Sequence, residues 1–264
     1  MKIGFIGCGN MATAMLKGIL KSGEVEASDM IASAKSDKTR EKIEKELGIR
    51  KADTNAQVVD FADVVFLAVK PQFLEGVLDE IRDSVKAGQI FISIAPGKTL
   101  QWLGERLGEN TKVIRTMPNT PAMVGEGMTA LCVNELVTEE ETALAVKLCD
   151  TFGKTEVIPE HLMDVVVGVS GSSPAYVFMF LEAMADAAVA DGMPRAQAYK
   201  FAAQAVLGSA KLMLETGKHP GELKDMVCSP AGTTIQAVRV LEEKGLRSAV
   251  IEAQTACVKK AKGM

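Results

Sequence analysis

Residues 2–12 read KIGFIGCGNMA, a short apolar run that ends in Gly-x-Gly-x-x-Ala and continues into a stretch of helix-forming residues. A strand, a tight turn and a helix in this order are what a dinucleotide-binding fingerprint requires. In such a unit Gly7 permits the sharp turn, Gly9 lets the backbone approach a pyrophosphate, and Ala12 leaves room for the helix to pack on the strand. The helix N-terminus adds free N–H groups and a positive dipole end. The segment therefore predicts a dinucleotide site, and the alternative is a glycine turn with a purely structural role.

The first 160 residues alternate short β-rich runs with helical patterns, which predicts βαβ crossovers. Several runs are continuously apolar, as is typical of a parallel sheet covered on both faces. The expected strands are residues 2–6, 30–33, 64–69, 90–94, 113–116, 128–133 and 155–158, with helical patterns at residues 37–47 and 73–85 among those between them. We predict an α/β fold in which residues 1–160 form a Rossmann-like, doubly wound, mostly parallel sheet that binds a dinucleotide.

Residues 161–264 show helical patterns and no strand signal. The expected helices are residues 174–191, 194–215, 220–227, 233–243 and 246–261. The first of them follows a capping context at Ser172 and Ser173, carries Pro174 in its first turn and is apolar on almost every side. A helix of that kind must be buried, and a domain of about a hundred residues offers little cover. We therefore predict an all-α dimerisation domain over residues 161–264 and an obligate homodimer.

Composition narrows the classes of partner. The chain has 264 residues, of which 47% are hydrophobic and 24% charged, as in an ordinary globular protein. A net charge of −4 gives no basic footprint, so we expect no nucleic-acid partner. Charges interrupt the apolar runs and no leader-like segment is present, so we expect no membrane span and a cytoplasmic location. The five cysteines form no Cys-x-x-Cys pair and the two histidines have no ligand spacing, so no metal site is expected.

The second expected strand ends in ASAKS at residues 32–36. A binder of NAD normally carries an acidic residue there, about 20 residues past the glycines, to hold the ribose 2′-hydroxyl. Ser33 and Lys35 instead offer a hydroxyl and a cation, which suit a 2′-phosphate. The pattern favours NADP(H) over NAD(H), and the alternative is a solvated loop in which Lys35 and Lys38 are only surface charges.

Two further strands end in small residues and proline, AVKP at residues 68–71 and IAPG at residues 94–97. Ligands of open α/β sheets lie beyond the carboxyl ends of the strands, and small side chains there leave space for a flat ring. Pro71 cannot donate a ladder hydrogen bond and ends the strand. Lys70 is equally well explained as a surface lysine or as a cofactor contact.

Three later segments make a resemblance specific: MPNTP at residues 117–121, SGSSPAYVF at residues 170–178 and SPAGTTI at residues 229–235. With the glycine segment and AVKP, they make the chain resemble the pyrroline-5-carboxylate reductase family over residues 1 to 247. Two positions depart from the family pattern, because Ser173 and Ala231 stand where the family usually has glycine. Each of these residues adds a Cβ near an expected substrate turn.

The resemblance implies an enzyme that reduces the C=N bond of a cyclic imino acid with NAD(P)H and forms L-proline, and the residues after the second strand make NADPH the preferred cofactor and NADH a possible one. It also implies a dinucleotide domain joined to a helical dimerisation domain, with dimers that often assemble further into rings. By resemblance, the cofactor site would be lined by Gly7, Cys8, Gly9, Asn10, Met11, Ser33, Lys35, Asn55, Ala68, Val69, Lys70, Pro71 and Ala95. The small imino-acid substrate would meet Glu160, Gly232, Thr233 and Thr234, with Thr234 as the catalytic residue.

The chemistry agrees with the shortage of histidines, because hydride attack on an imine needs no strong base. Thr233 and Thr234 would receive the substrate carboxylate through backbone N–H groups, and the Thr234 hydroxyl would hydrogen-bond the ring nitrogen. The simpler alternative is that Thr233 only caps a helix. A β-hydroxyacid dehydrogenase would place a catalytic lysine on helix 174–191, which has none. A nucleotide sensor that has kept the fold without turnover is the non-enzymatic alternative.

Overall fold

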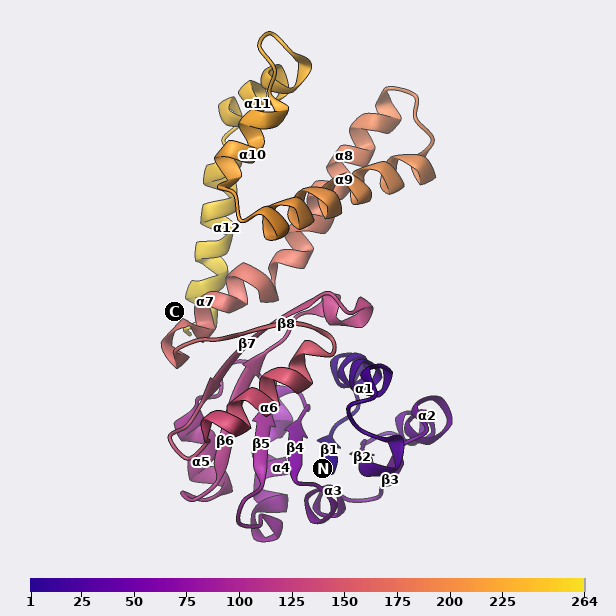
Figure 1. Ribbon diagram of the computed structural model, residues 1–264, viewed down its shortest axis with the longest axis vertical. Coiled ribbons are helices and arrows are strands. Elements are labelled where there is room, and N and C mark those ends of the chain that lie inside the picture. The colour runs from indigo at the N-terminus through magenta and orange to yellow at the C-terminus, as the bar shows by residue number, and fades with distance from the viewer. Residues whose placement is uncertain (264) are drawn as a thin grey trace. The chain divides into compact units, whose positions relative to one another are not determined.

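The computed structural model describes residues 1–263, and its first part is built on one eight-stranded sheet with strand order β3-β2-β1-β4-β5-β6-β7-β8 (Figure 1). All neighbouring strands are parallel except β6 and β7. The strands are β1 Ile3–Ile6, β2 Met30–Ser33, β3 Arg50–Ala52, β4 Val64–Leu67, β5 Ile90–Ser93, β6 Lys112–Met117, β7 Gly127–Val133 and β8 Gly153–Val157. The predicted mostly parallel sheet is confirmed, with every expected strand present.

Helices cover both faces of this sheet. They are α1 Asn10–Ser22, α2 Asp37–Leu47, α3 Asn55–Phe61, α4 Pro71–Ile81, α5 Leu100–Leu107, α6 Glu139–Asp150 and the short α7 Met163–Val166. One core cluster joins the sheet to α1, α2 and α6, and its centre is a stacked pair, Phe5 and Phe66, with ring centroids 4.5 Å apart. The other core cluster joins the sheet to α3, α4 and α5. The fold is therefore doubly wound, as predicted.

Strand order reverses between β1 and β4. From β1 the chain runs outward to β2 and β3, and then returns to place β4 on the other side of β1. In open α/β sheets this switch point is where ligands bind, in the crevice beyond the carboxyl ends of the strands. The glycine turn Gly7–Gly9 and the segment that follows β4 both lie at this point of the sheet.

Three local features differ from expectation or were not expected. The edge strand β3 was missed because its sequence, Arg50-Lys51-Ala52, has two exposed charged side chains and no apolar run. A π-helical turn, Val167–Gly171, precedes α8. Ser172 stands at the N-cap of α8, but its hydroxyl makes no cap hydrogen bond and instead accepts one from Cys257 Sγ at 3.2 Å.

Chain contacts divide the molecule into two compact units. One comprises Met1–Gly171 with the segment from Val258 onward, and the other comprises Ser172–Cys257. Residue 264, the last of the predicted second domain, lies outside the described residues. The second unit contains only helices, as predicted: α8 Ser173–Ala190, α9 Arg195–Thr216, α10 Pro220–Val227, α11 Thr233–Glu243 and most of α12 Leu246–Ala261.

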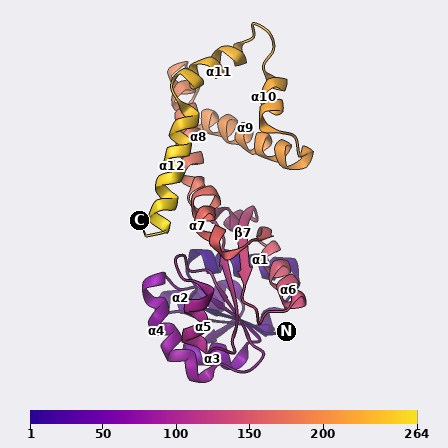
Figure 2. The ribbon, with the colours of Figure 1, turned by 90° about the vertical axis from the view of Figure 1, so that its left-hand side faces the viewer.

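Large apolar side chains of the second unit are left uncovered in a single chain. Helices α8 and α9 pack against each other and cross, as both ribbon views show (Figures 1 and 2). Buried residues on these two helices are alanines, whereas Phe178 is 65% exposed and Leu214 is 84% exposed. Uncovering this much apolar surface is unfavourable in water, so these helices need a partner surface.

The expectation that charges interrupt every apolar run was wrong for one stretch. The helical segment Glu160–Ala190 is long and apolar enough to cross a membrane, by length and composition alone. The reason is that no charged residue lies between Asp164 and Glu182. Helices that bury an apolar surface against other protein have the same composition.

Candidate active site

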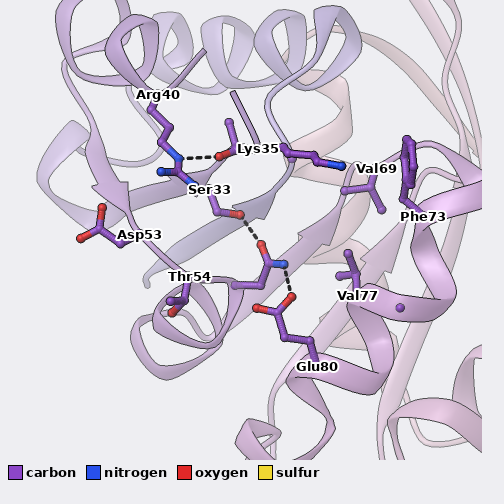
Figure 3. A pocket seen from close by; sticks show the side chains of 13 residues that line it. Ser33, Lys35, Arg40, Asp53, Thr54, Val69, Phe73, Val77 and Glu80 are labelled. Atoms are coloured by element: carbon purple, nitrogen blue, oxygen red, sulfur yellow. Dashed lines mark hydrogen bonds between the residues drawn. The ribbon is translucent and has the colours of Figure 1, made fainter. Parts of the chain in front are cut away.

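A cavity of about 440 Å³ lies at the carboxyl ends of β1, β2 and β4, at the switch point of the sheet. Residues of β2, α2, α3 and α4 and of the turns after β1, β2, β3 and β4 line it: Gly7, Ser33, Ala34, Lys35, Arg40, Asp53, Thr54, Asn55, Val69, Phe73, Gly76, Val77 and Glu80. Figure 3 shows Ser33 and Lys35 on one side of this space and Val69, Phe73 and Val77 on the other. The position of the cavity and the residues that line it are those expected of a dinucleotide-binding crevice.

The glycine turn is shaped for close backbone approach. Gly7 has φ +94°, and a Cβ on it would lie 2.6 Å from the carbonyl oxygen of Ala68. Gly9 is the N-cap of α1 and has nothing within 4 Å of the position of a Cβ, so its surface is open. No side chain caps α1, which leaves its first N–H groups available to an anion.

Hydrogen bonds tie the ends of the three central strands together around this turn. The N–H of Gly7 donates to the carbonyl of Ser33 at 3.1 Å, and the N–H of Ala68 donates to the carbonyl of Ile6 at 2.8 Å. Cys8, between the two glycines, is buried, and burial raises the pKa of its thiol. The thiol is therefore protonated and serves as a small apolar filler.

Polar side chains at the end of β2 form a connected set. Ser33 Oγ donates to Asn55 Oδ1 at 2.7 Å, and Asn55 Nδ2 donates to Glu80 Oε2 at 2.7 Å. Arg40 Nε donates to the carbonyl of Ala34 at 2.7 Å, which fixes the loop after β2. Lys35 Nζ lies 5.4 Å from the centroid of the Phe73 ring. Two cations, Lys35 and Arg40, thus follow the end of β2, and Arg40 also lies 3.6 Å from Asp37.

The structure brings the predicted cofactor residues to one edge of the sheet but not all into the cavity. Five of them line it: Gly7, Ser33, Lys35, Asn55 and Val69. The others lie on neighbouring turns, namely Cys8, Gly9, Asn10 and Met11 after β1, Ala68, Lys70 and Pro71 after β4, and Ala95 after β5.

The other residues that line the cavity were not predicted from the sequence, and two of them, Arg40 and Glu80, carry a charge that bears on the site. Arg40 stands one helical turn beyond the loop that carries Lys35, and a search for a second cation near that loop would have found it. Glu80 gave no signal, because it lies 25 positions from Asn55 on another helix and only the fold brings the two together.

The predicted substrate segment opens α11 in the second unit. Gly232 is the N-cap residue and provides no side-chain cap, and Thr233 is the first residue of the helix. The alternative that Thr233 caps the helix is therefore wrong. The first turn of α11 carries no acidic residue. Its N–H groups can therefore donate hydrogen bonds to a carboxylate, which the positive end of the helix dipole also attracts.

Ala231 has φ +57°, the only positive φ of a non-glycine residue in the part of the chain that the structure describes. It is one of the two positions where the chain lacks the glycine usual in the family. A residue with a Cβ in this left-handed region costs about 1–2 kcal/mol. Glycine would avoid that cost, but it makes the unfolded chain more flexible, which offsets part of the gain in stability.

We expect Ala231→Gly to raise the free energy of unfolding by about 0.5–1 kcal/mol, measured by denaturant unfolding at one fixed protein concentration. Ala188→Gly inside α8 is the matched control and should lower it by about the same amount. A loss of stability in Ala231→Gly equal to that of the control would show that the backbone at this turn carries no strain.

Glu160, predicted to meet the substrate, belongs to an ion-pair network of the first unit. Its Oε1 accepts from the N–H of Leu100 at 2.7 Å and from Arg115 at 3.1 Å, and Arg115 also lies 3.5 Å from Asp164. The Arg115 side chain is 7% exposed. Burial, with a smaller contribution from the Glu160 charge, raises the pKa of nearby Cys132 to about 12.

The MPNTP segment also acts within the first unit. Asn119, which is buried, accepts from the N–H of Met128 at 2.8 Å and donates to the carbonyl of Ser170 at 3.0 Å. One side chain thus connects the start of β7 to the π-helical turn Val167–Gly171. This contact gives the motif a structural reason that its sequence alone did not reveal.

Comparison with known proteins supports an oxidoreductase domain in the first part of the chain and a dimerisation domain in the second. The family described as pyrroline-5-carboxylate reductase dimerisation matches residues 160–264, so a dimerisation domain is present, and the family NADP oxidoreductase coenzyme F420-dependent matches residues 2–97. Pyrroline-5-carboxylate reductase of Escherichia coli (strain K12) is 57% identical over 259 residues, which are 98% of this chain and 96% of that protein.

Two solved structures have the same fold. Pyrroline-5-carboxylate reductase from Coxiella burnetii superposes with a TM-score of 0.93 at 35% identity, covering 99% of this chain and 97% of that one. Pyrroline carboxylate reductase from Plasmodium falciparum, solved with NADP bound, superposes with a TM-score of 0.88 at 28% identity, covering 100% and 97%. With 57% identity to a curated relative over almost its whole length, the chain belongs to the pyrroline-5-carboxylate reductase family.

Proposed function

We propose that the chain is a pyrroline-5-carboxylate reductase that uses NAD(P)H to reduce the C=N bond of 1-pyrroline-5-carboxylate, forming L-proline. The observation that carries the proposal is the 57% identity to a reductase over 98% of the chain. Support from the residues themselves comes from two places: an open glycine turn at the switch point and an uncapped helix start at Thr233.

The residues of the first unit fit NADP. A Cβ would fill the space at Gly7, and the surface of Gly9 is open, so a pyrophosphate would lie on the turn formed by residues 7–11. Lys35 and Arg40 would meet a 2′-phosphate, with Ser33 and Asn55 at the adenosine ribose. The remaining cofactor residues, Ala68, Val69, Lys70, Pro71 and Ala95, would lie toward the nicotinamide. NADPH is the preferred cofactor in this proposal, and NADH is the second.

When bound, the cofactor supplies the hydride, and this chain's own residues hold the acceptor. The N–H groups of Thr233 and Thr234 bind the substrate carboxylate at the start of α11, next to Gly232, whose own N–H donates to the carbonyl of Ser229 at 3.0 Å. The Thr234 hydroxyl hydrogen-bonds the ring nitrogen and so orients the imine carbon, which is worth far more here than a single proton transfer. Glu160 stays a predicted substrate-side residue, and its two hydrogen bonds to Leu100 and Arg115 favour a positioning role.

The proposal includes the assembly and location. The exposed apolar faces of α8 and α9 and the dimerisation family support a homodimer. We further propose that dimers assemble into a ring, that the protein is cytoplasmic without membrane or nucleic-acid partners, and that the boundary between the functional domains lies near residue 160.

One assay tests the function. The chain is mixed with NADPH and pyrroline-5-carboxylate, and the loss of nicotinamide absorbance is followed. We expect rapid loss with the cyclic imine and none with a β-keto acid. Loss with the β-keto acid alone would indicate a dehydrogenase, and tight NADPH binding without loss in either mixture would indicate a sensor.

Replacing Thr234 by alanine should lower turnover at least about tenfold, because one oriented hydrogen bond to the reacting ring is lost. The affinity for NADPH should stay unchanged, measured by direct binding. Thr234→Ser keeps the hydroxyl and is the matched control, expected to retain most of the activity. Equal turnover of Thr234→Ala and the unaltered chain would remove Thr234 from the mechanism.

A further inference from the structure

The cofactor cavity contains a chain of three polar side chains from three different elements. Ser33 ends β2, Asn55 begins α3 and Glu80 lies on α4, and all three line the cavity. The two 2.7 Å hydrogen bonds run from Ser33 to Asn55 and from Asn55 to Glu80, as the dashed lines of Figure 3 show. Ser33 is buried and Glu80 is exposed, so this series of hydrogen bonds runs from the core of the fold to solvent.

Glu80 sets the direction of these hydrogen bonds. An ionised carboxylate has no proton to donate and can only accept, so the Asn55 amide must turn its NH₂ group toward Glu80. The amide oxygen then faces Ser33, and the single hydroxyl proton of Ser33 is used in donating to it. Ser33 can therefore offer only a lone pair to a ligand in the cavity.

An acceptor at this place affects which nucleotide binds. In a dinucleotide bound at the switch point, the adenosine ribose lies by the end of the second strand, where Ser33 stands. A ribose 2′-hydroxyl can donate to the Ser33 oxygen, whereas a 2′-phosphate is itself an acceptor. The phosphate has to be met by Lys35 and Arg40, which line the same cavity.

We propose that Glu80 is a positioning residue that determines cofactor specificity. It fixes the Asn55 amide so that Ser33 accepts the 2′-hydroxyl of NADH, and it thereby keeps NADH usable beside NADPH. The inference rests on the proposed NAD(P)H site and adds to it a residue of α4 that belongs to no motif of the sequence.

Glu80→Gln tests the proposal, because glutamine keeps the size but can donate as well as accept, which releases the amide to turn over. The probes are 5′-AMP, which carries the 2′-hydroxyl, and 2′,5′-ADP, which carries the 2′-phosphate, with binding measured by calorimetry. We expect 5′-AMP to bind more weakly and the ratio of the two Kd values to move about fivefold toward 2′,5′-ADP, the size of one hydrogen bond. The ratio of the KM values for NADH and NADPH should move in the same direction.

Controls separate this effect from a plain change of charge. Removal of a negative charge by itself would tighten the binding of both phosphate-bearing probes, 5′-AMP included. In a Ser33→Ala background, Glu80→Gln should no longer shift the ratio. Asp79→Asn is the matched control on the same helix, because Asp79 pairs with Arg106 at 3.4 Å, and it should bind both probes as the unaltered chain does.

An unchanged ratio in Glu80→Gln would overturn the proposal, and so would the same shift in the Ser33→Ala background. If the unaltered chain binds neither probe and oxidises no NADPH, the proposed function itself fails. If the unaltered chain binds and turns over normally but Glu80→Gln behaves like Asp79→Asn, only the role of Glu80 fails.

Discussion

Gly7→Ala is expected to lower the affinity for NADPH at least about a hundredfold and the free energy of unfolding by about 3 kcal/mol. Two effects add at this position. Gly7 has φ +94°, which an L side chain rarely adopts, and the new Cβ would lie 2.6 Å from the Ala68 carbonyl oxygen and 2.9 Å from Val69. Because the first of these neighbours is backbone, the turn between β1 and α1 has to move, and the phosphate cradle moves with it.

Affinity is measured by NADPH fluorescence and stability by denaturant unfolding. Gly9→Ala separates the two effects, because a Cβ there meets nothing within 4 Å in the protein but would stand in the path of a pyrophosphate. It should unfold like the unaltered chain and still bind NADPH weakly. Gly104→Ala in α5 also meets nothing within 4 Å and is the control for a harmless substitution. Normal NADPH binding by Gly7→Ala would show that the turn between β1 and α1 does not hold the phosphates of the cofactor.

Arg115→Met is expected to lower the free energy of unfolding by about 2–3 kcal/mol, because it removes a buried cation and leaves behind two carboxylates that water reaches only in part. Arg115 is 7% exposed and lies within 3.1 Å of Glu160 and 3.5 Å of Asp164. The network joins the middle of β6 to the turn before α7. Denaturant unfolding measures the loss, and adding Glu160→Gln should recover part of it because the stranded charge is gone.

Arg106→Met is the matched control for this loss. Arg106 also pairs with two carboxylates, Glu75 and Asp79, but at the surface of α4 and α5. Exposed pairs of this kind contribute less than about 1 kcal/mol. If Arg115→Met and Arg106→Met destabilise the protein equally, the buried network has no special role in holding the turn at Glu160.

The centre of the sheet was predictable because β1, β2, β4 and β5 are short, almost entirely apolar runs that are buried along their whole length. β3 escaped because an edge strand with Arg50 and Lys51 needs no apolar pattern, only a neighbour with free backbone groups. The π-helical turn Val167–Gly171 has no local sequence signal that could have predicted it. A hydrogen bond reaches this turn from Asn119, which lies 51 positions from its partner Ser170.

The residues of the candidate site also differ in whether a local sequence pattern marks them. Gly7, Ser33 and Lys35 were found because local motifs mark the ends of two strands. Glu80 was not, because its only link to the site is a hydrogen bond to Asn55 that exists after folding. The strain at Ala231 was indicated only as a departure from the family pattern, and its physical form, φ +57°, came from the structure.

The central claim is that the chain transfers hydride from the nicotinamide of NADPH directly to the imine carbon of pyrroline-5-carboxylate. Transfer of an isotope label measures this directly: the chain is incubated with NADPH deuterated at nicotinamide C4 on the transferring face and with pyrroline-5-carboxylate, and the proline is analysed by mass spectrometry. The account predicts one deuterium per proline, on the former imine carbon. Proline without deuterium, or no proline from a chain that binds NADPH, would contradict it.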